Sequence, residues 1–401
     1  MYLTIMKPQA LQQIAVLARG LWIVEGPEGP EGFVLVIKAG KELILAARQR
    51  RELKLYLAPY NAEETTGLTL LTACFDDPQS PLLIKTPLIP GDPLTEALQS
   101  FPDEFSVCFF DEHNRELFSC KARAKLGQLR KELGTLSPIG ADHWPKMYEQ
   151  ADSWFSLTTY EDDARATTVF LQDDLFPSDY LITDLTRQDF RGSKGFSNTQ
   201  LERTEPGTFQ ELDIIYLLQR AYTSERIIHG PLKVSDGEEL ADVVVMGDEV
   251  TLLLQAKDSP NTPAMMNTTL ERKRKKAIGQ LKNGLQQLRG AISTIRREGN
   301  PALALVDGTP LDIDLAARPL VGVVVVRELF IDNYDEYSTM ILKFMDEVGV
   351  RVLAFDYNEF EVMTRHCPSE DALLSAFLQI SKCAEERRIY PRLRFTDLPP
   401  R

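Results

Sequence analysis

Residues 320–326 constrain the fold more than any other feature, because they read Leu-Val-Gly-Val-Val-Val-Val without a polar side chain. Successive side chains of a β-strand point to opposite faces of the sheet, so an entirely apolar strand needs cover on both faces. Such a strand is typical of the centre of a sheet that has helices on both sides. We therefore expect an α/β domain around this segment.

Residues 207–401 contain further elements that alternate with this strand. Helical stretches show apolar residues at spacings of three and four, whereas strands are short apolar runs bounded by turn residues. The predicted fold class is α/β, with a mixed sheet flanked by helices. The pattern predicts helices at 208–222, 270–298, 335–348 and 370–386, and strands at 226–234, 240–246, 250–256, 320–326 and 350–355.

The second and third of these strands are predicted to form a hairpin, because Gly247 and the aspartate after it favour a tight turn. A two-residue loop would place Asp242 opposite Leu253. The side-chain period of two then puts Asp242, Gln255 and Lys257 on one face of the hairpin. A lysine among valines and leucines is costly unless it has a partner or a function, so these polar residues are candidate site residues.

These residues carry the groups that phosphodiester hydrolysis requires. Such hydrolysis uses a hard cation with oxygen ligands, which polarises the phosphate and lowers the pKa of a bound water. Asp242 offers a carboxylate, Gln255 an amide oxygen and Ala256 its backbone carbonyl. Lys257 could orient or deprotonate the water, or neutralise charge in the transition state.

The segment from Asp242 to Gln255-Ala256-Lys257 resembles the PD-(D/E)XK nuclease superfamily, which contains many restriction endonucleases. The hallmark of this superfamily is an acid on one strand and (D/E)-X-K on the next, within an α-β-β-β-α-β core. Gln255 replaces the second acid, which is similar to the Q-X-K variant of restriction enzymes that cut modified DNA. The resemblance covers about residues 207–360 and implies a restriction-endonuclease-like fold.

The resemblance also implies roles for individual residues. Many members carry a glutamate on the helix before the hairpin, and Glu211 is at the matching position. Because Gln255 is neutral, cation binding would draw on Glu211 or Glu239, and His229 lies near the same site. The implied cofactor is Mg²⁺, for which Mn²⁺ can substitute. Its expected ligands are Asp242, Gln255, Glu211 and Ala256, and the expected catalytic residues are Asp242, Gln255, Lys257 and Glu211, with Glu239 as possible support.

The predicted helix at 270–298 contains nine Lys or Arg residues against two Asp or Glu. A basic stripe along a helix can follow a phosphate backbone. The alternative is that basic residues flank a buried apolar seam, with packed stems and charged ends in water. Gln280, on the same helix, is expected to point away from the core. The candidate nucleic-acid-binding residues are Lys273, Lys275, Lys276, Lys282 and Arg289.

The first half of the chain shows no catalytic motif. Residues 1–128 read as short strands punctuated by Pro and Gly, which predicts a β-rich α+β domain of unknown role. Residues 129–206 form an acidic middle region and linker, with eleven Asp or Glu against three Lys or Arg between 138 and 190. Its aromatic residues indicate that it folds, either as an ordinary surface or as a cover over a basic cleft. Asp111-Glu112-His113 is interpreted as a turn. The expected nuclease domain comprises residues 207–401.

The net charge of −14 argues against a protein that coats nucleic acid, although an enzyme needs only a local basic surface. The five cysteines lie far apart without CxxC spacing, which argues against a disulfide framework or a zinc site. No apolar run reaches the length of a membrane span. We therefore expect a cytoplasmic protein with no membrane partner.

The sequence thus predicts a Mg²⁺-dependent nuclease, most simply a DNA endonuclease of prokaryotic restriction or anti-phage defence. Its partners would be nucleic acid, with DNA favoured over RNA, and either further copies of the chain or partner subunits that supply a second active site. One alternative is an inactive nuclease-like subunit for nucleic-acid binding or assembly. A second is an RNase that uses the same site. A third concerns the N-terminal half, which could hold the nuclease off until it senses a trigger.

Overall fold

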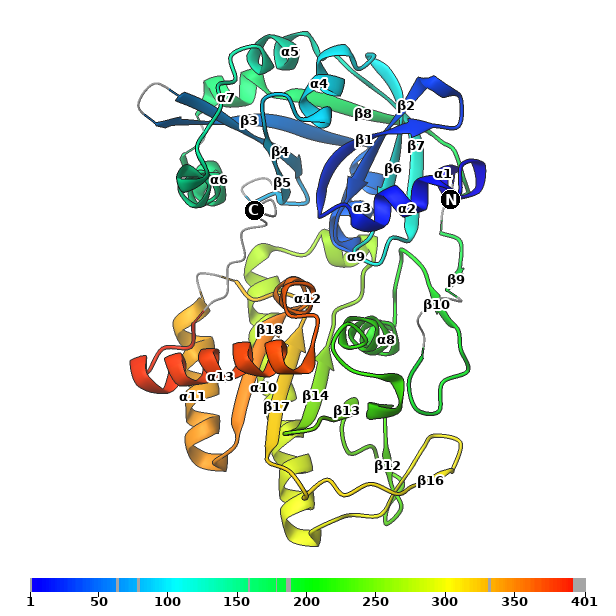
Figure 1. Ribbon diagram of the computed structural model, residues 1–401, viewed down its shortest axis with the longest axis vertical. Coiled ribbons are helices and arrows are strands. Elements are labelled where there is room, and N and C mark those ends of the chain that lie inside the picture. The colour runs from blue at the N-terminus through cyan, green and yellow to red at the C-terminus, as the bar shows by residue number, and fades with distance from the viewer. Residues whose placement is uncertain are drawn as a thin grey trace.

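The computed structural model describes residues 2–62, 65–77, 80–157, 159–177, 179–184, 189–330 and 333–391. The chain forms two units, each built on its own sheet, and the N-terminal unit lies at one end of the C-terminal sheet (Figure 1). Both units combine helices and strands, so the α/β prediction is confirmed at the level of a mixed sheet with flanking helices. No helix in these ranges is both long and apolar enough to cross a membrane.

The N-terminal unit is an eight-stranded sheet in the order β1-β2-β6-β7-β8-β3-β4-β5. Its two edge strands approach each other, since Leu21 N donates to Thr86 Oγ1 at 2.8 Å. The largely buried helix α3 packs against β3, β4, β5 and β7. The elements are α1 Tyr2–Met6, α2 Ala10–Val16, β1 Gly20–Gly26, β2 Gly29–Lys38, α3 Lys41–Arg50, β3 Glu52–Ala62, β4 Thr65–Cys74, β5 Leu82–Leu88, α4 Pro93–Ser100, β6 Glu104–Phe110, β7 Glu116–Ala124 and α5 Gly127–Leu133.

The acidic middle region belongs structurally to this N-terminal sheet. Strand β8 is inserted between β7 and β3, so the sheet continues past the expected boundary at residue 128. Helix α6 packs against β3 and β4, with Trp154 against Tyr56, and not along the basic helix of the C-terminal unit. The elements here are η1 Ala141–His143, α6 Trp144–Leu157, α7 Tyr160–Arg165 and β8 Thr167–Asp174, followed by the small β9 Ile182–Asp184 and β10 Ser197–Thr199.

The C-terminal unit is a five-stranded mixed sheet in the order β11-β13-β14-β17-β18. Strands β14, β17 and β18 are parallel, whereas β11, β13 and β14 form an antiparallel meander. Its elements are α8 Gly207–Leu218, η2 Ser224–Arg226, β11 Ile227–His229, β12 Leu232–Lys233, β13 Val243–Met246, β14 Thr251–Lys257, α9 Pro263–Met266, α10 Leu270–Glu298, β15 Leu303–Ala304, β16 Pro310–Leu311, β17 Leu320–Val326, α11 Tyr334–Val348, β18 Arg351–Asp356, α12 Tyr357–His366 and α13 Glu370–Arg387.

The apolar run that predicted a central strand is β17, which lies between β14 and β18 and is buried from Val321 to Val326. Helices α10 and α11 contact each other on one face of the sheet, and α8, α12 and α13 lie on the other (Figure 1). Gly284 allows α10 to approach closely, because a Cβ there would lie 2.5 Å from Val324 Cγ1. The strand expected at 226–234 is instead divided, since Gly230 has φ +51 and is followed by a proline.

Candidate active site

The hairpin that carries the candidate site has a longer loop than predicted. Val243 pairs with Leu254 and Met246 pairs with Thr251, so four residues form the loop, closed by Gly247 N donating to Val250 O at 3.0 Å. Asp242 therefore lies opposite the position of Gln255, not Leu253 as expected. Because the register differs by two residues, the side chains remain on the predicted face.

Three oxygen atoms converge at the end of this hairpin. The Lys257 ammonium donates to Asp242 Oδ2 at 3.0 Å, to Gln255 Oε1 at 3.2 Å and to the Ala256 carbonyl at 2.8 Å. These are three of the four oxygen groups expected to bind a cation. The structure therefore brings Asp242, Gln255, Ala256 and Lys257 together, with a positive charge at the focus of the oxygens.

Asp242 is fixed in place from two directions. Its Oδ2 also accepts a hydrogen bond from the backbone N–H of Ala256 at 2.7 Å, across the hairpin. The residue is only 7% exposed, and this burial raises the pKa of its carboxyl group, although Lys257 and the Ala256 N–H act in the opposite direction. The Asp242 carboxylate is thus held in a fixed position and is poorly solvated. Both properties favour a cation as its partner.

Glu211, His229 and Glu239 lie beside this group. Glu211 Oε2 is 2.8 Å from His229 Nε2, so the helix before the hairpin is linked to β11. Glu239 is an exposed residue, but its carboxyl group is close to Gly230, where a Cβ would lie 2.7 Å from Oε1. Partial burial and the negative charges of Asp242 and Glu211 raise the pKa of Glu239 to about 7. Glu211 and Glu239 therefore lie close enough to Asp242 for the three charges to influence one another, and their supporting role stays a prediction.

The donor atoms fit a hard divalent cation by their chemistry, because carboxylate, amide and backbone carbonyl oxygens are the ligands that Mg²⁺ and Ca²⁺ take. The position on which the oxygens of Asp242, Gln255 and Ala256 converge is already occupied by the ammonium group of Lys257. Among the residues that the structure describes, no group of three or more His, Cys, Asp or Glu side chains is arranged as a metal site. Any cation here would therefore depend on the neutral oxygens as well as on Asp242.

Several basic residues of α10 form ion pairs within the protein. Lys273 pairs with Asp76 of the N-terminal unit at 2.5 Å, Lys275 with Glu271 at 2.9 Å, and Arg289 with Glu347 at 2.5 Å. Burial lowers the pKa of Lys276, whose ammonium lies 3.9 Å from Met265 Sδ, and Lys282 is exposed. The Lys273 side chain is partly buried, at 21% exposure, as the alternative of packed stems describes. Lys275 and Arg289 remain exposed in their ion pairs, and the prediction that they bind a phosphate backbone stays a prediction.

Gln280 was wrongly expected to point away from the core. Its Nε2 donates to the Asp258 carbonyl at 2.7 Å and to Ser259 Oγ at 2.9 Å, directly after Lys257. A signal was present in the sequence, because Gln280 lies four residues before Gly284 and so on the same face of the helix. Gln280 therefore holds the end of β14 from α10.

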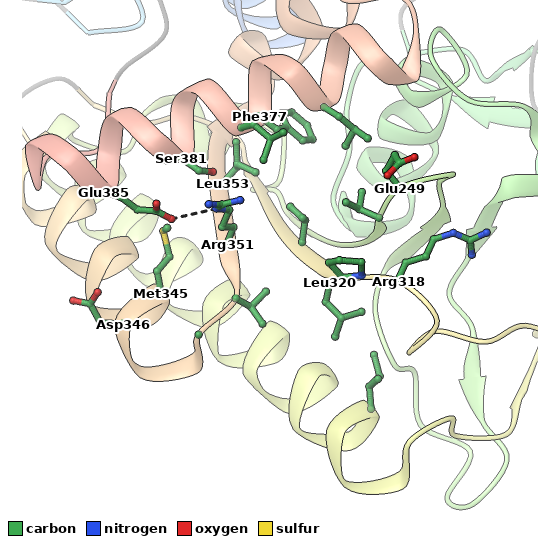
Figure 2. Close-up of a pocket in the computed structure, with 18 of the residues that line it drawn as sticks. Glu249, Arg318, Leu320, Met345, Asp346, Arg351, Leu353, Phe377, Ser381 and Glu385 are labelled. Carbon is green, nitrogen blue, oxygen red and sulfur yellow. Dashed lines mark hydrogen bonds and ion pairs between the residues drawn. The ribbon is translucent and has the colours of Figure 1, made fainter.

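A large groove lies at the other end of the parallel strands. This groove of about 1210 Å³ is lined by the start of β17 and β18 and by α10, α11 and α13, and Figure 2 shows the Arg351–Glu385 ion pair within it. Ligands of open α/β sheets bind outside the carboxyl ends of the strands. The oxygen cluster at the carboxyl end of β14 is therefore the better candidate for an active site, although the groove is larger.

Comparison with known proteins adds no family to this picture. No protein-family model matches the sequence, and no match was found among curated proteins. Functional inference for this chain therefore depends on the geometry and chemistry of the site itself.

Proposed function

We propose that this chain is a metal-dependent nuclease that hydrolyses phosphodiester bonds, with DNA as its substrate. The observation that carries the proposal is the convergence of Asp242, Gln255 and the Ala256 carbonyl on the Lys257 ammonium, each within 3.2 Å. Asp242, Gln255 and Lys257 are the residues on which the resemblance to the Q-X-K variant of the PD-(D/E)XK superfamily rests.

The order of elements supports the same proposal. From α8 through β11, β13, β14 and α10 to β17, the C-terminal unit follows the α-β-β-β-α-β order of that superfamily, with the short elements η2, β12, α9, β15 and β16 between them. The acid lies directly before β13 and the lysine ends β14. We infer a restriction-endonuclease-like fold from this order together with the site.

In this proposal Asp242, Gln255 and the Ala256 carbonyl hold Mg²⁺ or Mn²⁺, with Glu211 or Glu239 adding negative charge. When bound, the cation polarises the phosphate and lowers the pKa of a water molecule. Lys257 supplies a positive charge that can neutralise charge developing on the phosphate. Glu239, with a pKa of about 7, can hold or release a proton near neutral pH.

Cleavage assays test this proposal directly. Purified full-length protein is incubated with plasmid DNA, linear DNA and single-stranded RNA, with Mg²⁺, Mn²⁺ or EDTA. We expect metal-dependent cleavage of DNA that Asp242→Ala and Lys257→Ala each lower by about 100-fold or more. The matched control is Asp236→Ala, an exposed acid six residues before Asp242 that pairs with Lys233. Cleavage that persists in Asp242→Ala would remove the site from consideration.

The same assay addresses the RNase alternative, because preferential cleavage of RNA by the same residues would change the substrate and keep the site.

Cutting both strands of a duplex needs two active sites, so we propose that the nuclease acts as a homo-oligomer or with partner subunits. Prokaryotic restriction or anti-phage defence is the setting that this activity suggests by analogy with the superfamily.

One observation favours a second candidate function, a nuclease-like module that binds nucleic acid without cutting it. Lys257 already satisfies the oxygens of Asp242, Gln255 and Ala256, so the site is chemically complete without a metal. This candidate predicts DNA binding that is equal in EDTA and Mg²⁺ and unchanged in Asp242→Ala. Metal-dependent cleavage by the wild type would exclude it.

A further inference from the structure

The residue after the candidate catalytic lysine is held by the other unit of the protein. The Asp258 side chain is fully buried and lies 2.8 Å from Lys41 Nζ, at the first residue of α3. Lys41 is itself only 6% exposed and also lies over the ring of Tyr357. Each charge is costly to bury without the other, so this pair fixes the end of β14 against the N-terminal unit.

The segment after Asp258 is connected to the same end of α3. Asn261 Nδ2 donates to the Lys41 carbonyl at 3.3 Å, and its backbone exchanges two hydrogen bonds with Arg203. Arg327, at the end of β17, donates to the Pro260 carbonyl at 3.1 Å and pairs with Glu42 at 3.2 Å. The carboxyl ends of two neighbouring strands are thus tied to one helix terminus.

The helix that carries Glu211 is held from the N-terminal unit as well. Asp213, two residues later, pairs with Arg115 at 2.9 Å and with Arg203 at 2.8 Å, and all three residues are buried. Arg115 belongs to the turn between β6 and β7, where Asp111 Oδ1 accepts hydrogen bonds from two backbone N–H groups. The expected turn at Asp111 is confirmed, and it lies inside the junction of the two units.

We infer that Lys41 is a positioning residue for the active site, which acts through Asp258 to hold Lys257 and the Ala256 carbonyl in place. The N-terminal unit, whose role the sequence left unknown, then helps to form the active site. This inference rests on the proposed nuclease function. It concerns a pair separated by 217 positions in the chain, and no motif of the nuclease superfamily supplies it.

The test compares Lys41→Met, Asp258→Asn and the double variant with Arg48→Met in the full-length protein. Arg48 lies on the same helix and pairs with Glu202 at 3.5 Å, so its loss breaks another ion pair of α3, one that does not involve β14. We expect Lys41→Met to lower kcat by about 10- to 100-fold with little change in KM, because small displacements of catalytic groups carry losses of this size. The double variant should lose no more than either single variant, since the two residues act as a unit.

Amide hydrogen exchange separates this inference from the proposed function. In Lys41→Met, amides at 256–261 should exchange faster than in the wild type and in Arg48→Met, whether or not the protein cleaves DNA. If cleavage is absent in the wild type but exchange increases as expected, the positioning contact stands and the nuclease proposal fails. If Lys41→Met matches Arg48→Met in exchange and in kcat, the positioning role is overturned.

Discussion

Lys257 supplies the positive charge that stabilises the three oxygen atoms around its ammonium group. Without it, the Asp242 carboxylate would lie beside two further oxygens and would keep, among the residues that the structure describes, the Ala256 N–H as its donor. We expect Lys257→Met to lower the free energy of unfolding of the metal-free protein by about 1–3 kcal/mol, because a largely buried carboxylate loses its charged partner. Urea denaturation in EDTA measures this, with exposed Lys382→Met as a control that stays within about 0.5 kcal/mol of the wild type. Equal stability of both variants would show that the pair contributes nothing.

The raised pKa of Glu239 predicts how the stability of the protein depends on pH. Its pKa in the folded protein is raised to about 7, above the ordinary value of 4.5, so the folded state binds the proton more tightly. Its stabilising contribution is therefore complete below about pH 4.5 and is lost as the pH rises through about 7. In EDTA, Glu239→Gln should be more stable than the wild type at pH 8 and indistinguishable from it at pH 4. A constant difference across this range would contradict the raised pKa.

At the scale of elements, the contact between α10 and the sheet depends on Gly284. A Cβ at this position would lie 2.5 Å from Val324 Cγ1 and 3.6 Å from Lys257 Cγ. We expect Gly284→Ala to destabilise the protein by about 1–3 kcal/mol through overpacking, and to disturb Lys257. Gly279→Ala on the same helix meets no atom within 4 Å and should stabilise by about 0.5–1 kcal/mol through helix propensity. Thermal unfolding compares the two, and a neutral Gly284→Ala would indicate looser packing.

Helices and strands with a regular pattern of apolar residues were predictable from the sequence. The bounds of α10 at 270–298 and the strand at 320–326 agree with the structure, because each has a continuous pattern on the buried side. The shared face of Asp242 and Lys257 was also predicted, since a shift of two residues preserves it. The loop length was not, because partners distant in sequence hold the loop: Arg226 pairs with Asp248, whose backbone N–H donates to Glu370.

No pattern in the local sequence indicated the contacts between the two units. Lys41 and Asp258 are ordinary charged residues in sequence, and only the tertiary fold buries them together. Likewise β8 was hidden within an acidic region whose composition indicated a surface, yet it completes the N-terminal sheet. Sequence patterns therefore predicted the groups that could perform the chemistry, but not the residues that hold those groups in position.

At the scale of the whole molecule, the junction bears on the idea that residues 1–206 restrain the nuclease. Their removal would leave Asp213 and Asp258 without Arg115, Arg203 and Lys41. Breaking a buried pair costs about 3–5 kcal/mol, which is a large part of the stability of a typical domain. We expect the fragment 207–401 to be unfolded or aggregated by circular dichroism and gel filtration. A folded fragment with increased cleavage would support restraint instead.

The length of α10 has a mechanical consequence. The helix begins where Lys273 contacts Asp76 and ends where Ile295 lines the distant groove, and its 29 residues form a rod about 43 Å long. It contains no proline at which it could bend. We expect a tilt of this continuous helix at the groove to be transmitted towards Lys257, because α10 lies closest to the sheet at Gly284, beside that lysine.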